Sequence, residues 1–254
     1  MTQPLKVLCI GNGFSQDASW YLEQIAAAGT IPMLVRNLYI GGCSLERHAD
    51  NLKHLAFEYE YQQNGRHLFD TLVPGRKKGI SIRMALRMEE WDVVTVQQVS
   101  QLSGIYESYI PYLAEMLKVI RSVCPRARIF FHSTWAYELD SQHTGFENYQ
   151  YDQQRMVEAI EQVTARISEQ YSLPVIPSGK LIQMLRQTAP FDYAHGGLSL
   201  CRDGFQLSRD YGRYAVGLLW YHVLTGMPVT GNSFAPPDTD PALIQLIQQT
   251  VDSL

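Results

Sequence analysis

The stretch that decides the fold is KVLCIGNGFSQD, at residues 6–17. Residues 6–10 form a short apolar run typical of a buried strand, and residues 11–17 are typical of a turn that leads into a helix over residues 18–28. A serine at such a junction, here Ser15, has its hydroxyl at the carboxyl edge of the sheet. Its N–H lies at a helix N-terminus, where developing negative charge is stabilised. This placement is typical of a nucleophile for acyl transfer.

Strands and helices alternate along the rest of the chain. Further strands are predicted at residues 32–40, 92–96, 128–131 and 175–176, with helices over 45–55, 107–123, 151–171 and 209–224 and one ending near 90. This alternation predicts an α/β fold, a three-layer α/β/α sandwich with a flavodoxin-like parallel sheet of about five strands. We expect a single domain over residues 1–254, with a β-hairpin insertion at about 57–72 and a short C-terminal helix at about 239–252.

Composition narrows the classes of partner. The formal net charge of −4 comes without basic clusters, which argues against nucleic acid and anionic membrane surfaces and favours a small-molecule partner. The N-terminus lacks the apolar region of a signal peptide and no run is long enough to span a membrane, so we expect a cytoplasmic protein. The four cysteines and seven histidines show no metal-ligand spacing, so we expect reduced structural thiols, no metal and no cofactor. Oligomeric state is left open.

Polar residues and glycines follow the predicted strands. In open parallel sheets, ligands bind beyond the carboxyl ends of the strands. These ends carry residues 11–15, 41–44, 97–98 and 132–135 and the loop at 191–206. The sequence GNG at 11–13 also begins a dinucleotide-binding fingerprint, but Gln16 occupies the third glycine position and no acid closes the second strand, which argues against a nucleotide site.

Four blocks of sequence together resemble those of the SGNH (GDSL-type) hydrolase superfamily. They are IGNGFS at 10–15, GGCS at 41–44, the pair Gln97-Gln98, and DGFQ at 203–206. The chain is most similar to a bacterial branch that reads IGNSFS-like in the first block, GGCS-like in the second and Gln-Gln in the third. The resemblance extends from Val7 to about Leu224. It implies hydrolysis of esters, often of acetyl groups on carbohydrates, without a cofactor.

The resemblance also implies a role for each matching position. Ser15 would be the nucleophile, Gly42 a backbone oxyanion donor, Gln98 or Gln97 the amide oxyanion donor, with Gln98 preferred, and Asp203 the acid that orients the base. Gln206 stands where the family has histidine. A glutamine amide can hold the shape of the site, but it cannot take a proton near neutral pH.

Three explanations for Gln206 remain open: a natural pseudo-enzyme, a deliberately disabled variant, or a base supplied from elsewhere. His195 and His132 are the histidines expected at this edge, and with Gln97 and Trp135 they are expected to line the substrate site. Structural alternatives remain for these residues, including Ser15 as a helix N-cap and both histidines as hydrogen-bonded wall residues. The sequence therefore predicts a serine esterase for a small ester. The alternative is an inactive binding module for an acylated carbohydrate.

Overall fold

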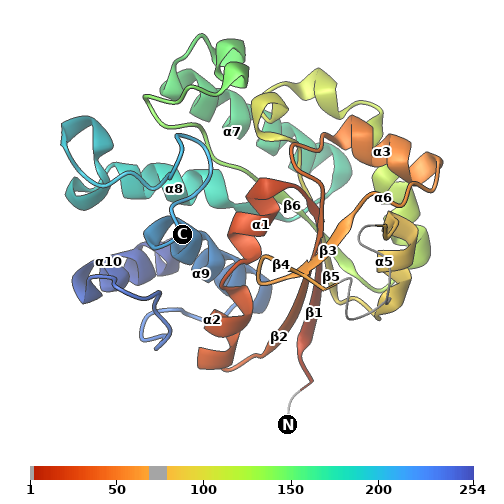
Figure 1. Cartoon of the computed structure of the whole chain (residues 1–254), viewed down its shortest axis with the longest axis horizontal. Helices are drawn as coiled ribbons and strands as arrows, with labels where there is room; N and C mark the ends of the chain where they lie inside the picture. The colour runs from red at the N-terminus through yellow and green to blue at the C-terminus, as the bar shows by residue number, and fades with distance from the viewer. Residues whose placement is uncertain (1–2, 69–78) are drawn as a thin grey trace.

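The computed structural model describes residues 3–68 and 79–254 (Figure 1). Within these ranges the sheet has seven strands in the order β4-β3-β2-β1-β5-β6-β7. The strands are β1 (Leu5–Gly11), β2 (Met33–Tyr39), β3 (Glu60–Gln63), β4 (Arg66–His67), β5 (Val93–Val96), β6 (Arg128–Ser133) and β7 (Val175–Pro177). The run β2-β1-β5-β6-β7 is parallel throughout, which confirms the predicted parallel sheet.

The hairpin of β3 and β4 extends this sheet at one edge. The two strands pair antiparallel across the turn at Asn64-Gly65, and β3 pairs antiparallel with β2 from Asn37 to Tyr39. The hairpin therefore adds two strands to the five predicted. Residues 69–72 of the predicted insertion lie outside the described part of the chain.

The helices are α1 (Gly13–Ser19), α2 (Leu22–Ala28), α3 (Leu45–Lys53), α5 (Ile82–Met88), α6 (Tyr112–Val123), α7 (Gln153–Tyr171), α8 (Ser178–Arg186), α9 (Tyr211–Thr225) and α10 (Pro241–Asp252). Short 3-10 turns occur at Ser100–Leu102, Tyr106–Tyr109, Thr144–Tyr149, Ala189–Phe191 and Tyr193–His195. None of the described helices is both long and apolar enough to cross a bilayer.

The helix predicted at 18–28 starts five residues earlier and is split in two. Asn12 is the N-cap of α1, and its side chain accepts the N–H of Phe14, so the first helical turn already includes Gly13 and Ser15. The helix α8 was not predicted. It has only nine residues, and Pro177 at its N-cap provides no side-chain hydrogen bond, so the usual sequence signal for a helix start is missing.

Helices cover both faces of the sheet, because side chains alternate along each strand. In β1, Val7 and Cys9 pack into a core with α1, α2, α8, α9 and α10. Leu8 and Ile10 point the other way, into a core with α3, α5 and α6. The helix α7 contributes side chains to both cores. These two cores make the predicted three-layer sandwich (Figure 1).

A buried carboxylate joins the two ends of the fold. Asp17 on α1 is fully buried, and it accepts from Arg213 Nε of α9 at 2.8 Å, from Arg202 Nη1 at 3.1 Å and from the N–H of Leu207 at 2.8 Å. Burial raises the pKa of Asp17, and the two arginines act in the opposite direction. These bonds fix the loop over residues 202–207 against α1.

We expect Asp17→Asn to destabilise the fold, because it leaves Arg213, whose side chain is only 5% exposed, without its counter-charge. Removing one partner of a buried ion pair lowers the free energy of unfolding by about 3–5 kcal/mol. Urea unfolding measures this change in the free energy of unfolding. The control is Asp50→Asn, which removes an exposed pair with His54 and should cost less than about 1 kcal/mol. Equal losses in the two variants would contradict this role for Asp17.

Candidate functional site

The candidate site is built around Asn12, between β1 and α1. Its Oδ1 accepts from Phe14 N at 3.0 Å and from Gln97 Nε2 at 2.8 Å. Its Nδ2 donates to the carbonyl of Cys43 at 3.0 Å. One side chain therefore ties the turn after β1 to the loops that follow β2 and β5, and the first three sequence blocks meet at one sheet edge.

Ser15 does not lie as predicted. The residue is 1% exposed. Its hydroxyl is the donor to two oxygens, the Asn12 carbonyl at 2.8 Å and Asn37 Oδ1 on β2 at 2.7 Å. The hydroxyl proton is thus directed toward Asn12 and Asn37, inside the protein, which differs from the exposed arrangement expected of a nucleophile that faces Gln206. Helix geometry explains this placement. Ser15 lies two residues after Gly13 on α1, and residues two apart on a helix point to nearly opposite sides.

The position that faces Gln206 is Gly13. A Cβ placed on Gly13 would lie 3.0 Å from Gln206 Nε2. Because residue 13 is a glycine, no side chain extends from this position toward Gln206. The sequence contains a sign of this glycine. The similar branch reads IGNSFS-like in the first block, with a serine at the place of Gly13, and this chain reads IGNGFS.

Gln206 is held by Arg202 and by a tight turn. Its Oε1 accepts from Arg202 Nη2, and its carbonyl accepts from the N–H of Arg202 at 2.8 Å. Asp203 lies beside it, but Asp203 Oδ1 accepts from the main-chain N–H groups of Phe205, at 3.2 Å, and Gln206, at 2.7 Å. The carboxylate therefore shapes the turn at Gly204, which has φ +82°, instead of orienting the side chain of Gln206.

The predicted oxyanion donors Gly42 and Gln98 differ in how far their hydrogen-bonding groups are already used. Gly42 is exposed, has φ +62°, and its N–H makes no hydrogen bond within residues 3–68 and 79–254. Gln98 is fully used elsewhere. Its Nε2 donates to the carbonyl and hydroxyl of Ser108, both at 3.0 Å, and its Oε1 accepts from the N–H groups of Leu45 and Val99. The two donor hydrogens of Gln98 therefore hold the loop after β5, and they are not free for the oxyanion role that the sequence predicts.

Gln97 belongs to a buried chain of hydrogen bonds with a defined direction. Because its Nε2 donates to Asn12, its Oε1 faces His132 Nδ1, at 2.9 Å. An amide oxygen can only accept, so Nδ1 carries the ring proton of His132. His132 Nε2 is then an acceptor, and it receives the hydroxyl proton of Ser178 at 3.0 Å. This chain connects the turn after β1 to β6 and α8.

His132 is not a replacement base, and neither it nor Gln97 lines an open site. Both are buried, and desolvation lowers the pKa of His132 to about 3. The acceptor nitrogen of the neutral ring is occupied by Ser178. The sequence predicts that these two residues contact substrate, whereas the structure buries both and pairs their polar atoms with each other, with Asn12 and with Ser178.

The two remaining predicted site residues also have structural surroundings. Trp135 is fully buried, stacks on Phe14 with ring centroids 4.2 Å apart, and donates from Nε1 to the carbonyl of Phe205 at 2.7 Å. This hydrogen bond supports the loop that carries Gln206. The sequence predicts that Trp135 contacts substrate, whereas the structure buries its side chain. His195 is 82% exposed and pairs with Asp192 at 2.8 Å within one surface turn.

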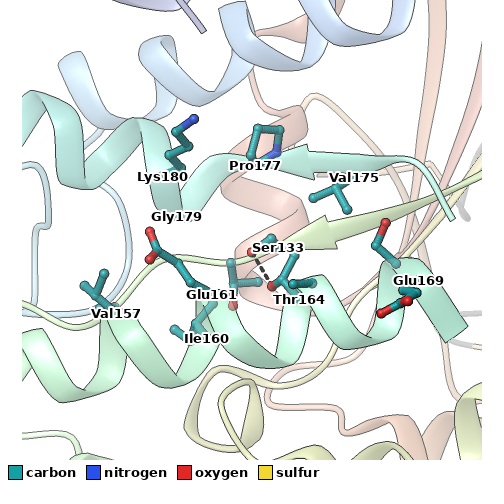
Figure 2. A pocket seen from close by; sticks show the side chains of 14 residues that line it. Ser133, Val157, Ile160, Glu161, Thr164, Glu169, Val175, Pro177, Gly179 and Lys180 are labelled. Atoms are coloured by element: carbon teal, nitrogen blue, oxygen red, sulfur yellow. Dashed lines mark hydrogen bonds between the residues drawn. The ribbon is translucent and has the colours of Figure 1, made fainter.

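A cavity of about 570 Å³ lies elsewhere, between α7 and α8 (Figure 2). Its lining is largely apolar and includes Val157, Ile160 and Val175, while Glu161 and Lys180 contribute charge. None of the predicted site residues lines it. In the described ranges, no three His, Cys, Asp or Glu side chains are grouped as a metal site requires.

Solved structures of other proteins share this fold. A proposed SGNH hydrolase from Slackia heliotrinireducens superposes with a TM-score of 0.55 at 17% identity, covering 87% of this chain and 100% of that one. The acetyl xylan esterase AlAXEase superposes with a TM-score of 0.52 at 10% identity, covering 86% of this chain and 99% of its own. The chain has the fold of the SGNH hydrolases.

The family is defined more closely by sequence. The family described as "Domain of unknown function (DUF4886)" matches residues 6–251, so the chain belongs to this family. A crystal structure of a DUF4886 family protein from Bacteroides uniformis has a TM-score of 0.88 and 35% identity, covering 99% of this chain and 94% of that one. No curated protein sequence matches the chain.

The buried neutral His132 predicts acid sensitivity. In the unfolded chain the imidazole takes up a proton near pH 6.5, but in the folded chain it stays neutral until about pH 3. The free energy of unfolding therefore falls as pH decreases through this window. Between pH 7 and pH 5, His132 should account for a loss of about 2 kcal/mol. Urea unfolding at both pH values should show a smaller loss in His132→Gln than in the parent. Equal losses would contradict a buried neutral His132.

Proposed function

We propose that this chain is a non-hydrolytic member of the SGNH-hydrolase fold, which binds a small acyl compound at the edge formed by Gly13, Gly42 and Gln206. One observation carries the proposal: the position that faces Gln206 is a glycine. Acyl transfer through a covalent intermediate needs a nucleophile there and a base beside it. Glycine has no nucleophilic atom, and a neutral amide cannot accept the proton.

Both groups that the reaction needs, the nucleophile and the base, are missing. Removing the nucleophile or the base of a serine triad costs roughly 10⁴ to 10⁶ in rate, and what remains comes from oxyanion donors and binding. In this chain the expected amide donor Gln98 is also committed to Ser108. Little of the machinery for turnover is therefore in place, and binding is the role that the geometry supports best.

Binding is supported by what the site retains. The N–H of Gly42, at an exposed turn, has no hydrogen-bond partner in the described part of the chain, and Asn12 holds this loop in place through the Cys43 carbonyl. The loop of Gln206 is fixed by the buried Asp17, although burying a carboxylate costs several kcal/mol. This rigid placement of an exposed turn suits recognition of a ligand. Small esters, among them acylated carbohydrates, and the acids that such esters release are the compounds to test, because esterases share the fold.

Restoring the missing groups tests the proposal. The unmodified chain should not hydrolyse p-nitrophenyl acetate above background. Gly13→Ser and Gln206→His should each remain inactive, whereas the double variant should gain orders of magnitude in rate, because only then do nucleophile and base face each other. The new Cβ at residue 13 meets only the flexible end of Gln206, so it can be accommodated. Initial rates of p-nitrophenol release measure all four proteins.

Ser15→Ala is the matched control, made in the unmodified chain and in the double variant. It should leave the rate of each unchanged, provided that folding is intact, because the Ser15 hydroxyl is bonded to Asn12 and Asn37. Hydrolysis by the unmodified chain that is lost in Ser15→Ala would refute the proposal and restore the esterase interpretation.

A further inference from the structure

The amide of Gln206 has a fixed direction. Arg202 carries only donors, so the atom of Gln206 that meets its Nη2 must be the amide oxygen, Oε1. The other amide atom, Nε2, therefore faces Gly13, at 3.0 Å from the place of a Cβ. Arg202 itself cannot turn freely, because its Nη1 contacts both carboxylate oxygens of Asp17 at 3.1 Å. The buried ion pair thus sets which end of the amide faces the site.

This direction reverses the polarity that hydrolysis requires. A general base presents a lone pair to the nucleophile, whereas Gln206 presents N–H groups to the same space. A second donor belongs to the same sheet edge: the N–H of Gly42 makes no hydrogen bond within residues 3–68 and 79–254, and its neighbour Cys43 is bonded to the Asn12 side chain. A ligand that contacts both groups must accept hydrogen bonds from both.

We infer that the ligand presents a carboxylate to Gln206 and Gly42, so that the site binds a small organic acid and not its ester. The inference rests on the proposed binding role. A carboxylate has two acceptor oxygens, one for each donor, and its hydrogen bonds are stronger than those of a neutral carbonyl. Arg202 and Arg213 both pair with Asp17, so one of these two positive charges is left to offset the carboxylate of Asp203 in the same loop. Asp203 Oδ1 is already engaged by two N–H groups of its own turn.

Nuclear magnetic resonance of the full chain, labelled with ¹⁵N-glutamine, tests this directly. Acetate, propionate and butyrate are titrated against the corresponding methyl esters and primary amides. The Gln206 side-chain resonances are identified by their absence from the Gln206→Glu spectrum. We expect the carboxylates to shift these resonances and to bind at least about tenfold more tightly than the ester or amide of the same length.

Three variants distinguish a change in the polarity of the Gln206 side chain from a change in folding. Gln206→Glu keeps the size of the side chain but turns the donor into a carboxylate, so it should weaken carboxylate binding by about tenfold or more. Gln187→Glu makes the same charge change at an exposed position at the end of α8 and should leave binding unchanged. Gln206→Asn, which keeps the amide but shortens its reach, should also weaken binding if Gln206→Glu fails to fold.

The inference is overturned if esters or amides bind as tightly as the acids, if Gln206→Glu binds carboxylates as well as the parent does, or if no carboxylate moves the Gln206 resonances. Each result is obtained without turnover. The proposed non-hydrolytic role fails by a different result, namely hydrolysis by the unmodified chain, so the two failures can be told apart.

Discussion

The arrangement of the candidate site depends on the buried carboxylate of Asp17. It joins α1, at the start of the chain, to the loop of Arg202 and to α9, positions that are 185 and 196 residues away in sequence. Together with Trp135, which donates to the Phe205 carbonyl, this contact holds the turn at residues 203–206 near Gly13. A charge buried at a cost of several kcal/mol therefore serves to position a polar amide at the sheet edge. The same contact fixes the direction of that amide, through Arg202.

The fold could be predicted from the sequence because its signals are local. The apolar run at residues 6–10 and the alternation of strands with long helices are repeated along the chain, and they define a parallel sheet covered on both faces. The nucleophile position could not be assigned in the same way. Asn12, as N-cap, starts α1 at Gly13 instead of Ala18. A boundary shift of five residues moves Ser15 from the predicted turn onto a buried helix face, where it meets Asn37.

The two glutamines after β5 show a second limit of sequence reasoning. A pattern can indicate that buried amides need partners, but it cannot say which partners they find. Gln97 bonds to Asn12 and His132, and Gln98 bonds to Ser108 and Leu45, so adjacent residues stabilise different parts of the edge. These contacts depend on the loops at 41–45 and 100–108, whose conformations have no periodic sequence signal. The substitution at Gln206, by contrast, was visible in the sequence because a single expected residue type was missing.

We propose that residue 13, and not Ser15, occupies the position of the nucleophile opposite residue 206. Mass-spectrometric mapping of a fluorophosphonate probe tests it most directly, because this reagent labels an activated serine. The account predicts no adduct on the unmodified chain, and a single adduct at residue 13 in the Gly13→Ser, Gln206→His double variant. An adduct on Ser15 in either protein would contradict it.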